Sequence, residues 1–144
     1  MNATVSPASV VVRRFIAAPR EVLFNAWLDA ASLAAWLRPF DTIESKVTMD
    51  PVEGGAFDIV MRTPGGDVPH HGEFIVIDPH KRLVFTWISE HTYGKASLVT
   101  VDFLASGKST EIVLTHEQLP EEKMQAHNGG WTSGLEKLAA RYEA

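Results

Sequence analysis

The chain has 144 residues and a formal net charge of −5 at pH 7, and 45% of its residues are hydrophobic. This length is typical of one domain, and the apolar fraction is sufficient for a sizeable core. The 18 acidic residues outnumber the 13 basic ones and no basic cluster occurs, which argues against nucleic acid as a partner. Because the chain contains no cysteine, disulfides, thiolate nucleophiles and cysteine-ligated metals are excluded.

The two ends and the hydropathy pattern indicate a single domain over residues 1–144. Residues 1–9 have neither the charged region nor the apolar run of a secretory signal, and we expect them to form a flexible tail. No apolar stretch reaches the roughly 20 residues that a bilayer span requires, so no membrane contact is expected. Together with the lack of cysteine, these features predict a cytoplasmic protein.

The first third of the chain predicts one strand followed by two short helices. Residues 10–16 are rich in β-branched side chains and form the first predicted strand. Pro19 suits the first position of a helix, and apolar residues then recur at helical spacing as far as Trp27. A second short helix, capped by Ser32, ends before Pro39.

The middle of the chain predicts a series of strands. Polar and apolar residues alternate in segments separated by short turns that contain glycine or proline. Such short connections are typical of an antiparallel meander. The predicted strands cover residues 43–49, 56–62, 72–77, 82–89, 95–104 and 110–117.

The last segment, residues 120–142, predicts a long helix. Trp131, Leu135 and Leu138 lie at helical spacing on one apolar stripe. Gly129 and Gly130 interrupt the pattern, and each glycine costs about 1 kcal/mol relative to alanine inside a helix. The pair therefore marks either a helix boundary or a place where the backbone approaches another group closely.

These elements predict an α+β domain in which a curved antiparallel sheet of six or seven strands wraps around the C-terminal helix. One amphipathic helix covers only part of such a sheet unless the sheet curves around it. The space between the sheet, the long helix and the two short helices is then a natural cavity.

Several sequence fragments resemble one known family. They are residues 15–27 (FIAAPREVLFNAW), 36–39 (WLRP), 53–57 (EGGAF), 72–74 (GEF), 82–87 (RLVFTW), 114–117 (LTHE), 130–131 (GW) and 135–138 (LEKL). Their order and spacing resemble the START-like (SRPBCC, birch-pollen-allergen-like) superfamily. The match is to the branch related to the C-terminal domain of the activator of the heat-shock protein 90 ATPase.

The resemblance implies a helix-grip fold whose cavity serves different members for lipids, hormones or polyketides. Leu37 stands where members often have a second tryptophan, and Asp50-Pro51-Val52-Glu53 replaces a turn that usually contains arginine. Both departures could alter what fits the cavity. Because a fold does not determine function, the family name does not imply chaperone activation.

Aromatic residues are the most informative candidates for the cavity wall. They occur on every inward-facing element, and aromatic walls suit flat or apolar ligands. Phe24 and Trp27 are assigned to the core. The predicted ligand-binding residues that line the cavity are Trp36, Phe40, Phe57, Ile59, Met61, Phe74, Phe85, Trp87, His116, His127, Trp131 and Leu135.

The histidines are the candidates for catalysis or metal binding. His116 falls on the inward face of the last predicted strand, and His127 precedes Trp131 by one helical turn, so the two could meet at the cavity mouth. His70 and His71 are neighbours on a strand, so they point to opposite faces and cannot share an ion. Their position beside a hairpin predicts solvent exposure.

The remaining polar residues give no recognisable chemistry. His80 and His91 fall in predicted turns, where exposure is expected. Arg62 ends a strand, where simple exposure is the favoured interpretation and pairing with an acidic ligand group is the alternative. The carboxylates alternate with apolar residues as on a solvated sheet face. No nucleophile elbow, zinc-protease motif or phosphate-binding loop occurs, and we predict no catalytic residue, metal or cofactor.

Three functions remain open. The favoured one is non-catalytic binding of a small apolar molecule in the cavity. The second is a chaperone-related or stress-response protein-interaction domain, and the third is a cyclase, dehydratase or hydrolase that uses His116 or His127. Exposed strand edges could also support a homodimer.

Overall fold

The computed structural model describes residues 9–143, so most of the predicted N-terminal tail lies outside the described residues. The strands are β1 (Val10–Ile16), β2 (Glu44–Met49), β3 (Ala56–Thr63), β4 (Gly66–Asp78), β5 (Arg82–Ser89), β6 (Ser97–Ser106) and β7 (Ser109–Glu117). The α-helices are α1 (Arg20–Trp27), α2 (Ala30–Trp36) and α3 (Met124–Ala140), and the 3₁₀ turns are η1 (Glu90–Thr92) and η2 (Glu121–Lys123).

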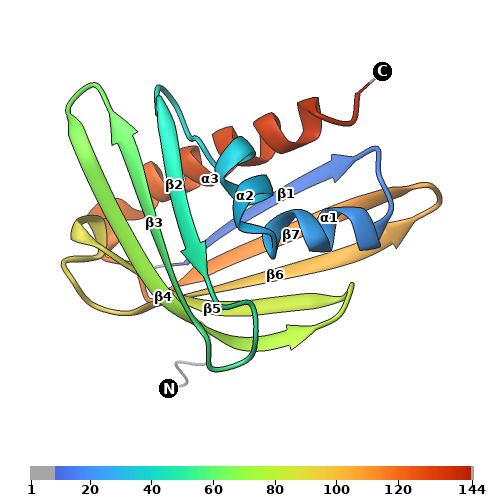
Figure 1. The fold of residues 1–144 in the computed structure, drawn as a ribbon, viewed down its shortest axis with the longest axis horizontal. Coiled ribbons are helices and arrows are strands. Elements are labelled where there is room, and N and C mark those ends of the chain that lie inside the picture. The colour runs from blue at the N-terminus through green and yellow to red at the C-terminus, as the bar shows by residue number, and fades with distance from the viewer. Residues whose placement is uncertain (1–8, 144) are drawn as a thin grey trace.

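The strands form one seven-stranded sheet in the order β1-β7-β6-β5-β4-β3-β2, and every neighbouring pair is antiparallel. In Figure 1 strands β2 and β3 run steeply across the view while β6 lies close to horizontal, and β4 bends from one direction to the other, which shows how strongly the sheet curves. Helix α3 lies along the concave side, with α2 next to it and α1 packed against α2 and β6 (Figure 1). The predicted α+β helix-grip architecture is confirmed.

The two short helices start where local chemistry allows. Pro19 occupies the N-cap position of α1, where its lack of an N–H group costs no hydrogen bond. The carboxylate of Asp29 accepts from the backbone N–H groups of Ala31 and Ser32 and so caps α2. The cap is therefore Asp29 and not the predicted Ser32, because the helix begins three residues earlier than its apolar pattern suggests.

Helix α3 is continuous through its two adjacent glycines. A Cβ atom added to Gly129 would lie 2.9 Å from Cζ of Phe40, and one added to Gly130 would lie 3.9 Å from Cε2 of the same ring. The glycines therefore mark a close approach and not a helix boundary: the loop before β2 packs directly on the helix backbone at this point.

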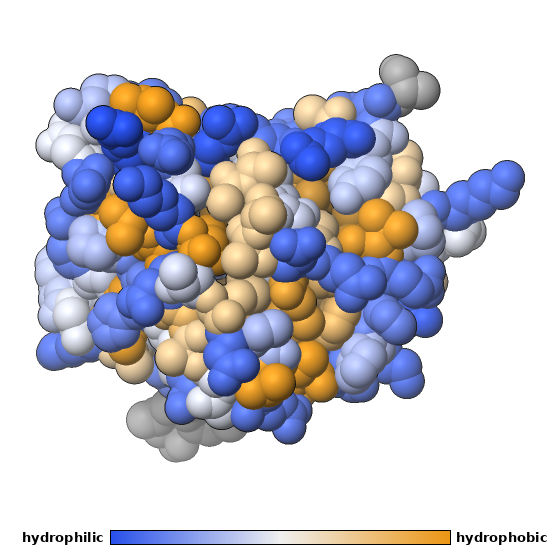
Figure 2. Space-filling model, in the orientation of Figure 1, coloured by the Kyte–Doolittle hydropathy of each residue, from blue (hydrophilic) through white to orange (hydrophobic). Residues whose placement is uncertain are grey.

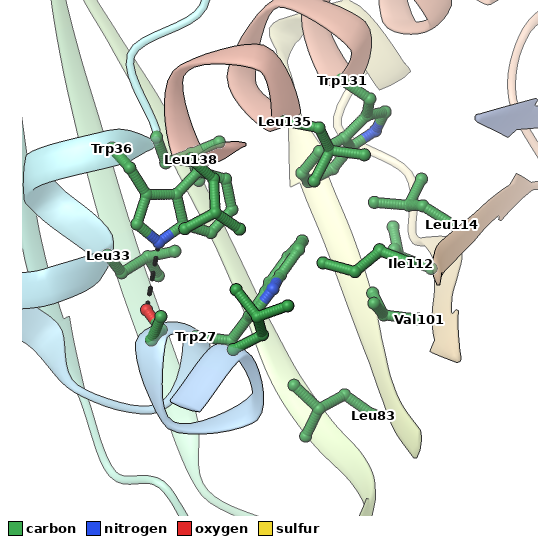
Figure 3. Packing of buried hydrophobic residues seen from close by; sticks show 14 of the residues in the cluster. Trp27, Leu33, Trp36, Leu83, Val101, Ile112, Leu114, Trp131, Leu135 and Leu138 are labelled. Carbon is green, nitrogen blue, oxygen red and sulfur yellow. Dashed lines mark hydrogen bonds between the residues drawn. The ribbon is translucent and has the colours of Figure 1, made fainter. Parts of the chain in front are cut away.

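The core is built around aromatic side chains from the three helices (Figure 3). The rings of Trp27 and Trp36 meet edge to face with centroids 4.8 Å apart, and Trp27 stacks on Trp131 at 6.1 Å. The indole N–H of Trp36 donates a 3.1 Å hydrogen bond to the carbonyl of Ala26, drawn as the dashed line in Figure 3. This bond links α2 to α1. It also satisfies the indole N–H and the carbonyl, which would otherwise be buried without a partner.

The surface in this view is mainly hydrophilic, with a paler apolar band over the place of α2 (Figure 2). That band fits the composition of α2, whose sequence AASLAAW contains four alanines. Within residues 9–143, no helix is long and apolar enough to cross a bilayer.

Candidate ligand-binding site

A cavity of about 300 Å³ lies between the start of α3, the loop before β2 and the end of the sheet formed by β3 and β4. Most of the cavity wall is apolar. Side chains from β5 and η1 also line the cavity. The lining residues are Leu37, Pro39, Phe40, Asp41, Thr42, Met61, Thr63, Val68, His70, Trp87, His91, Ala126, His127, Gly130 and Trp131. A second void nearer α1 holds only about 20 Å³.

The structure divides the predicted lining residues into three groups. The large cavity is lined by Phe40, Met61, Trp87, His127 and Trp131. The small void lies among Phe57, Ile59, Phe74 and Phe85, whose rings and side chains pack on one another, and also contacts Trp87 and Trp131. Neither space is lined by Trp36, His116 or Leu135, each of which is at most 1% exposed and belongs to the core.

The apolar back wall comes from the sheet and from α3. Met61 and Val68 face each other across the β3–β4 pair. The rings of Trp87 on β5 and Trp131 on α3 lie with centroids 5.0 Å apart. A ligand in the cavity would therefore contact thioether, aliphatic and indole surface, which suits apolar or flat molecules.

His116 holds Trp131 in place from behind this wall. The indole N–H of Trp131 donates to Nδ1 of His116 over 2.9 Å, so this nitrogen carries no proton. The proton of the neutral ring must then sit on Nε2, which lies 2.7 Å from Oγ of Ser97, and Ser97 donates in turn to the carbonyl of Trp87 over 2.6 Å. This chain of hydrogen bonds links α3 to three strands and fixes the indole of Trp131, whereas at Trp87 it reaches only the backbone carbonyl.

Burial, and to a smaller extent the nearby His127, lower the pKa of His116 to about 3. The hydrogen-bond chain agrees, because a proton on Nδ1 would face the indole N–H. His116 is therefore a neutral structural residue, fully occupied by its two partners.

His70 is a lining residue that the sequence analysis placed on the surface. Its neighbour His71 is exposed, as expected, but His70 is only 7% exposed and lines the cavity. Its Nδ1 lies 3.3 Å from the carbonyl of Ile59, and its ring lies 4.9 Å from that of Trp87. Burial lowers the pKa of His70 to about 4, so the ring is neutral at pH 7.

The predicted proximity of His116 and His127 is confirmed, with ring centroids 5.0 Å apart. His127 lines the cavity, and its Nδ1 lies 2.8 Å from the carbonyl of Lys123, one helical turn back. Burial lowers the pKa of His127 as well. His91, which was expected to be exposed in a turn, is half-buried and lines the same cavity.

The loop before β2 forms the outer wall. Phe40 has a positive φ of 55° and is 60% exposed, yet its ring lies against the glycines of α3. The hydroxyl of Ser133 accepts from the backbone N–H of Phe40 over 2.8 Å, and the ammonium of Lys137 donates to the carbonyls of Arg38 and Phe40. These contacts hold the loop on α3 beside the cavity.

The polar groups of the site do not form a recognisable catalytic set. Within residues 9–143, no carboxylate is hydrogen bonded to His70, His116 or His127, and no group of His, Asp and Glu side chains could hold a metal ion. Arg62 lies outside the cavity and pairs with Glu44 at 3.6 Å on the surface.

The family model described as "Activator of Hsp90 ATPase homolog 1-like protein" matches residues 17–143. The chain belongs to this family. The match covers all the helices and all the strands except β1, so the resemblance to this branch of the START-like superfamily is confirmed. The comparison with curated proteins finds no match.

Solved structures share the fold of this family member over nearly its full length. Protein CV1439 from Chromobacterium violaceum is 22% identical with a TM-score of 0.82, and the alignment covers 96% of this chain and 99% of that one. PFC0360w, described as an HSP90 activator from Plasmodium falciparum, is 26% identical with a TM-score of 0.76 and coverage of 93% and 95%. CalU16 from Micromonospora echinospora is 23% identical with a TM-score of 0.72 and coverage of 93% and 78%.

Proposed function

We propose that this domain binds a small, mostly apolar molecule in the cavity beside α3 without transforming it. The cavity of about 300 Å³ carries the proposal, since the void nearer α1 holds only about 20 Å³. The volume of the larger cavity lies at the lower end of the range of about 300 to 1,000 Å³ for ligand sites.

The composition of the cavity wall supports an apolar ligand. Met61, Val68, Trp87 and Trp131 offer apolar and aromatic surface, and the hydrogen-bond chain behind Trp131 keeps one indole in a fixed position. A preorganised wall lowers the entropy that is lost when a ligand binds. The polar groups that reach the cavity are few, as expected of a site that orients an apolar molecule with a small number of contacts.

The test is native mass spectrometry of the purified protein, followed by extraction and identification of any bound molecule. A parallel titration with the neutral fluorophore N-phenyl-1-naphthylamine uses a probe of the same chemistry. We expect saturable binding with quenching of tryptophan fluorescence, because Trp87 and Trp131 line the cavity. The absence of both a co-purified molecule and saturable probe binding would contradict the proposal.

A second candidate is chaperone-linked activity, favoured by the full-length likeness to the Plasmodium falciparum protein described as an HSP90 activator. It is tested by measuring the ATPase rate of a purified heat-shock protein 90 with and without this domain. An ATPase rate that rises saturably with the concentration of the domain would support chaperone-linked activity. An unchanged rate would contradict it.

Catalysis receives no such support. His116 is 0% exposed and is paired at both ring nitrogens, so it cannot exchange a proton with a ligand in the cavity without breaking the chain to Ser97 and Trp131. His127 lines the cavity but is not hydrogen bonded to a carboxylate among the described residues. The proposal is therefore limited to binding.

A further inference from the structure

We propose that the polar end of the ligand is an uncharged hydroxyl, of an alcohol or a phenol, whose O–H donates to Nε2 of His127. This inference rests on the binding function proposed above and specifies the chemistry of its ligand. It excludes carboxylates as preferred ligands. Two observations support the inference: the hydrogen bond made by His127, and the charges around the cavity.

The tautomer of His127 is fixed by the helix that carries it. Nδ1 lies 2.8 Å from the carbonyl of Lys123, and a carbonyl oxygen can only accept, so Nδ1 carries the proton. In the neutral ring Nε2 is then a hydrogen-bond acceptor. No group within residues 9–143 donates to Nε2, so this acceptor is free for a ligand.

The ring stays neutral because of its surroundings. Burial is the main cause of its lowered pKa, and the nearby His91 and Lys123 lower the pKa further. The bond from Nδ1 to the Lys123 carbonyl acts in the opposite direction but does not outweigh burial. A neutral acceptor requires a donor from the ligand, and a hydroxyl group supplies one.

The charges around the cavity disfavour an anion. No lysine or arginine of residues 9–143 lines it, and the one charged residue in the wall is Asp41. The ammonium of Lys123 lies 5.9 Å above the ring of Tyr93 and is not part of the wall. His91, which does line the cavity, lies 3.9 Å from a carboxylate oxygen of Glu90. A carboxylate would therefore lose its hydration without gaining a cation, which is costly.

The other end of the cavity accommodates the body of such a ligand. Trp87 and Trp131 form the aromatic wall, and Met61 faces Val68 across the strand pair. An aromatic or aliphatic body on this wall, with one hydroxyl directed towards α3, satisfies both surfaces. His70 adds a second neutral imidazole to the polar side.

The experiment compares two probes that differ by one group, 2-naphthol and 2-methylnaphthalene, by fluorescence titration of the full chain. The variants are His127→Phe, which keeps a ring of similar size, and His71→Phe, an exposed control on β4. We expect His127→Phe to weaken 2-naphthol about tenfold, the value of one hydrogen bond to a buried acceptor. Binding of 2-methylnaphthalene should change by less than about twofold, and His71→Phe should change neither.

The outcomes separate this inference from the function on which it rests. Binding of both probes without discrimination, unaffected by His127→Phe, would overturn the hydroxyl assignment and leave apolar binding intact. Tighter binding of 2-naphthoate than of 2-naphthol would also overturn it. If neither neutral probe bound, the proposed function itself would fail.

A measurement on the unaltered protein covers the case in which His127→Phe does not fold. The ¹⁵N resonance of Nε2 in an imidazole shifts when this nitrogen accepts a hydrogen bond. We expect 2-naphthol to move the ¹⁵N resonance of His127 Nε2 upfield, because the lone pair of this nitrogen then accepts a hydrogen bond, and 2-methylnaphthalene to leave the resonance in place. Equal effects of the two probes would contradict the assignment.

Discussion

The indole N–H of Trp131 on α3 donates a 2.9 Å hydrogen bond to Nδ1 of His116 on β7, inside a core where neither residue is more than 4% exposed. This bond attaches the C-terminal helix to the sheet through a polar pair surrounded by apolar side chains. It also sets one wall of the cavity, because the same indole faces the ligand site.

Replacing His116 by leucine should destabilise the fold by about 3 kcal/mol, because Trp131 and Ser97 both lose a buried hydrogen-bond partner. Urea unfolding followed by circular dichroism measures the loss. The double variant with Trp131→Phe should be less destabilised than the sum of the two single variants, since the two residues share one interaction. Additive effects would show that the bond contributes nothing.

Stability should fall as the solution becomes more acidic below pH 6.5, before most carboxylates titrate. In the folded protein the pKa of His116 is about 3 and that of His70 is about 4, below their ordinary value of 6.5. Between about pH 6.5 and 4 these two histidines are therefore protonated in the unfolded chain but neutral in the native state. Each of the two histidines should lower the free energy of unfolding by about 1.4 kcal/mol per pH unit in this range.

Urea midpoints at several pH values between about 7 and 5 test this directly. The variant His70→Phe should show a shallower dependence than the parent protein, and His71→Phe should keep the original slope. A midpoint that does not change over this range would contradict the neutral, buried state of both imidazoles.

Two glycines of α3 should respond differently to alanine. At Gly129 the new Cβ meets the tip of the exposed Phe40 ring at 2.9 Å, and that ring can move away. At Gly134 it meets Cδ1 of the buried Leu37 at 3.3 Å and Cζ3 of Trp36 at 3.8 Å. Both variants gain about 1 kcal/mol of helix propensity, but only Gly134→Ala overpacks the core.

We therefore expect Gly129→Ala to unfold at or above the temperature of the parent protein, with altered NMR signals of the Phe40 ring. Gly134→Ala should be the less stable of the two by about 1 kcal/mol. The reverse order in thermal unfolding would show that the contact of Phe40 with α3 matters more for stability than the packing around Leu37.

Gly72 on β4 should not tolerate alanine. An added Cβ would lie 2.0 Å from the backbone oxygen of Thr86 on β5 and 2.6 Å from Cζ of Phe57, and a backbone atom cannot rotate out of the way. We expect a loss of at least about 3 kcal/mol or failure to fold. Gly65→Ala, whose nearest contact is 3.8 Å, serves as the matched control and should fold normally.

The order of helices and strands could be predicted from the sequence because it depends on local patterns. Alternation along each strand and short turns are sufficient to indicate an antiparallel sheet. The structure differs mainly at the ends of elements: β4 starts earlier, at Gly66, and α3 starts later, at Met124. The burial of His70 could also be predicted from the sequence. The His70 side chain lies on the same strand face as Gly72 and Phe74, while His71 and Glu73 face the solvent. The neighbouring hairpin, which by itself favours exposure, does not override this alternation.

The extent of the cavity could not be predicted in the same way. Phe57, Phe74 and Phe85 resemble Trp87 in their sequence pattern, yet they fill the interior while Trp87 borders the open space. That difference depends on how side chains from β3, β4 and β5 interlock in three dimensions. The role of Gly129 is likewise set by a tertiary contact, since Phe40 lies far from it in the sequence.

The measurement that tests the central proposal most directly is a titration of N-phenyl-1-naphthylamine into the parent protein and two tryptophan variants. Val68→Trp places an indole in the cavity, whereas Val11→Trp places one at a position that is 51% exposed on β1. We expect Val68→Trp to abolish saturable binding and Val11→Trp to bind like the parent. Equal binding by all three proteins would show that the probe does not occupy this cavity and would contradict the account.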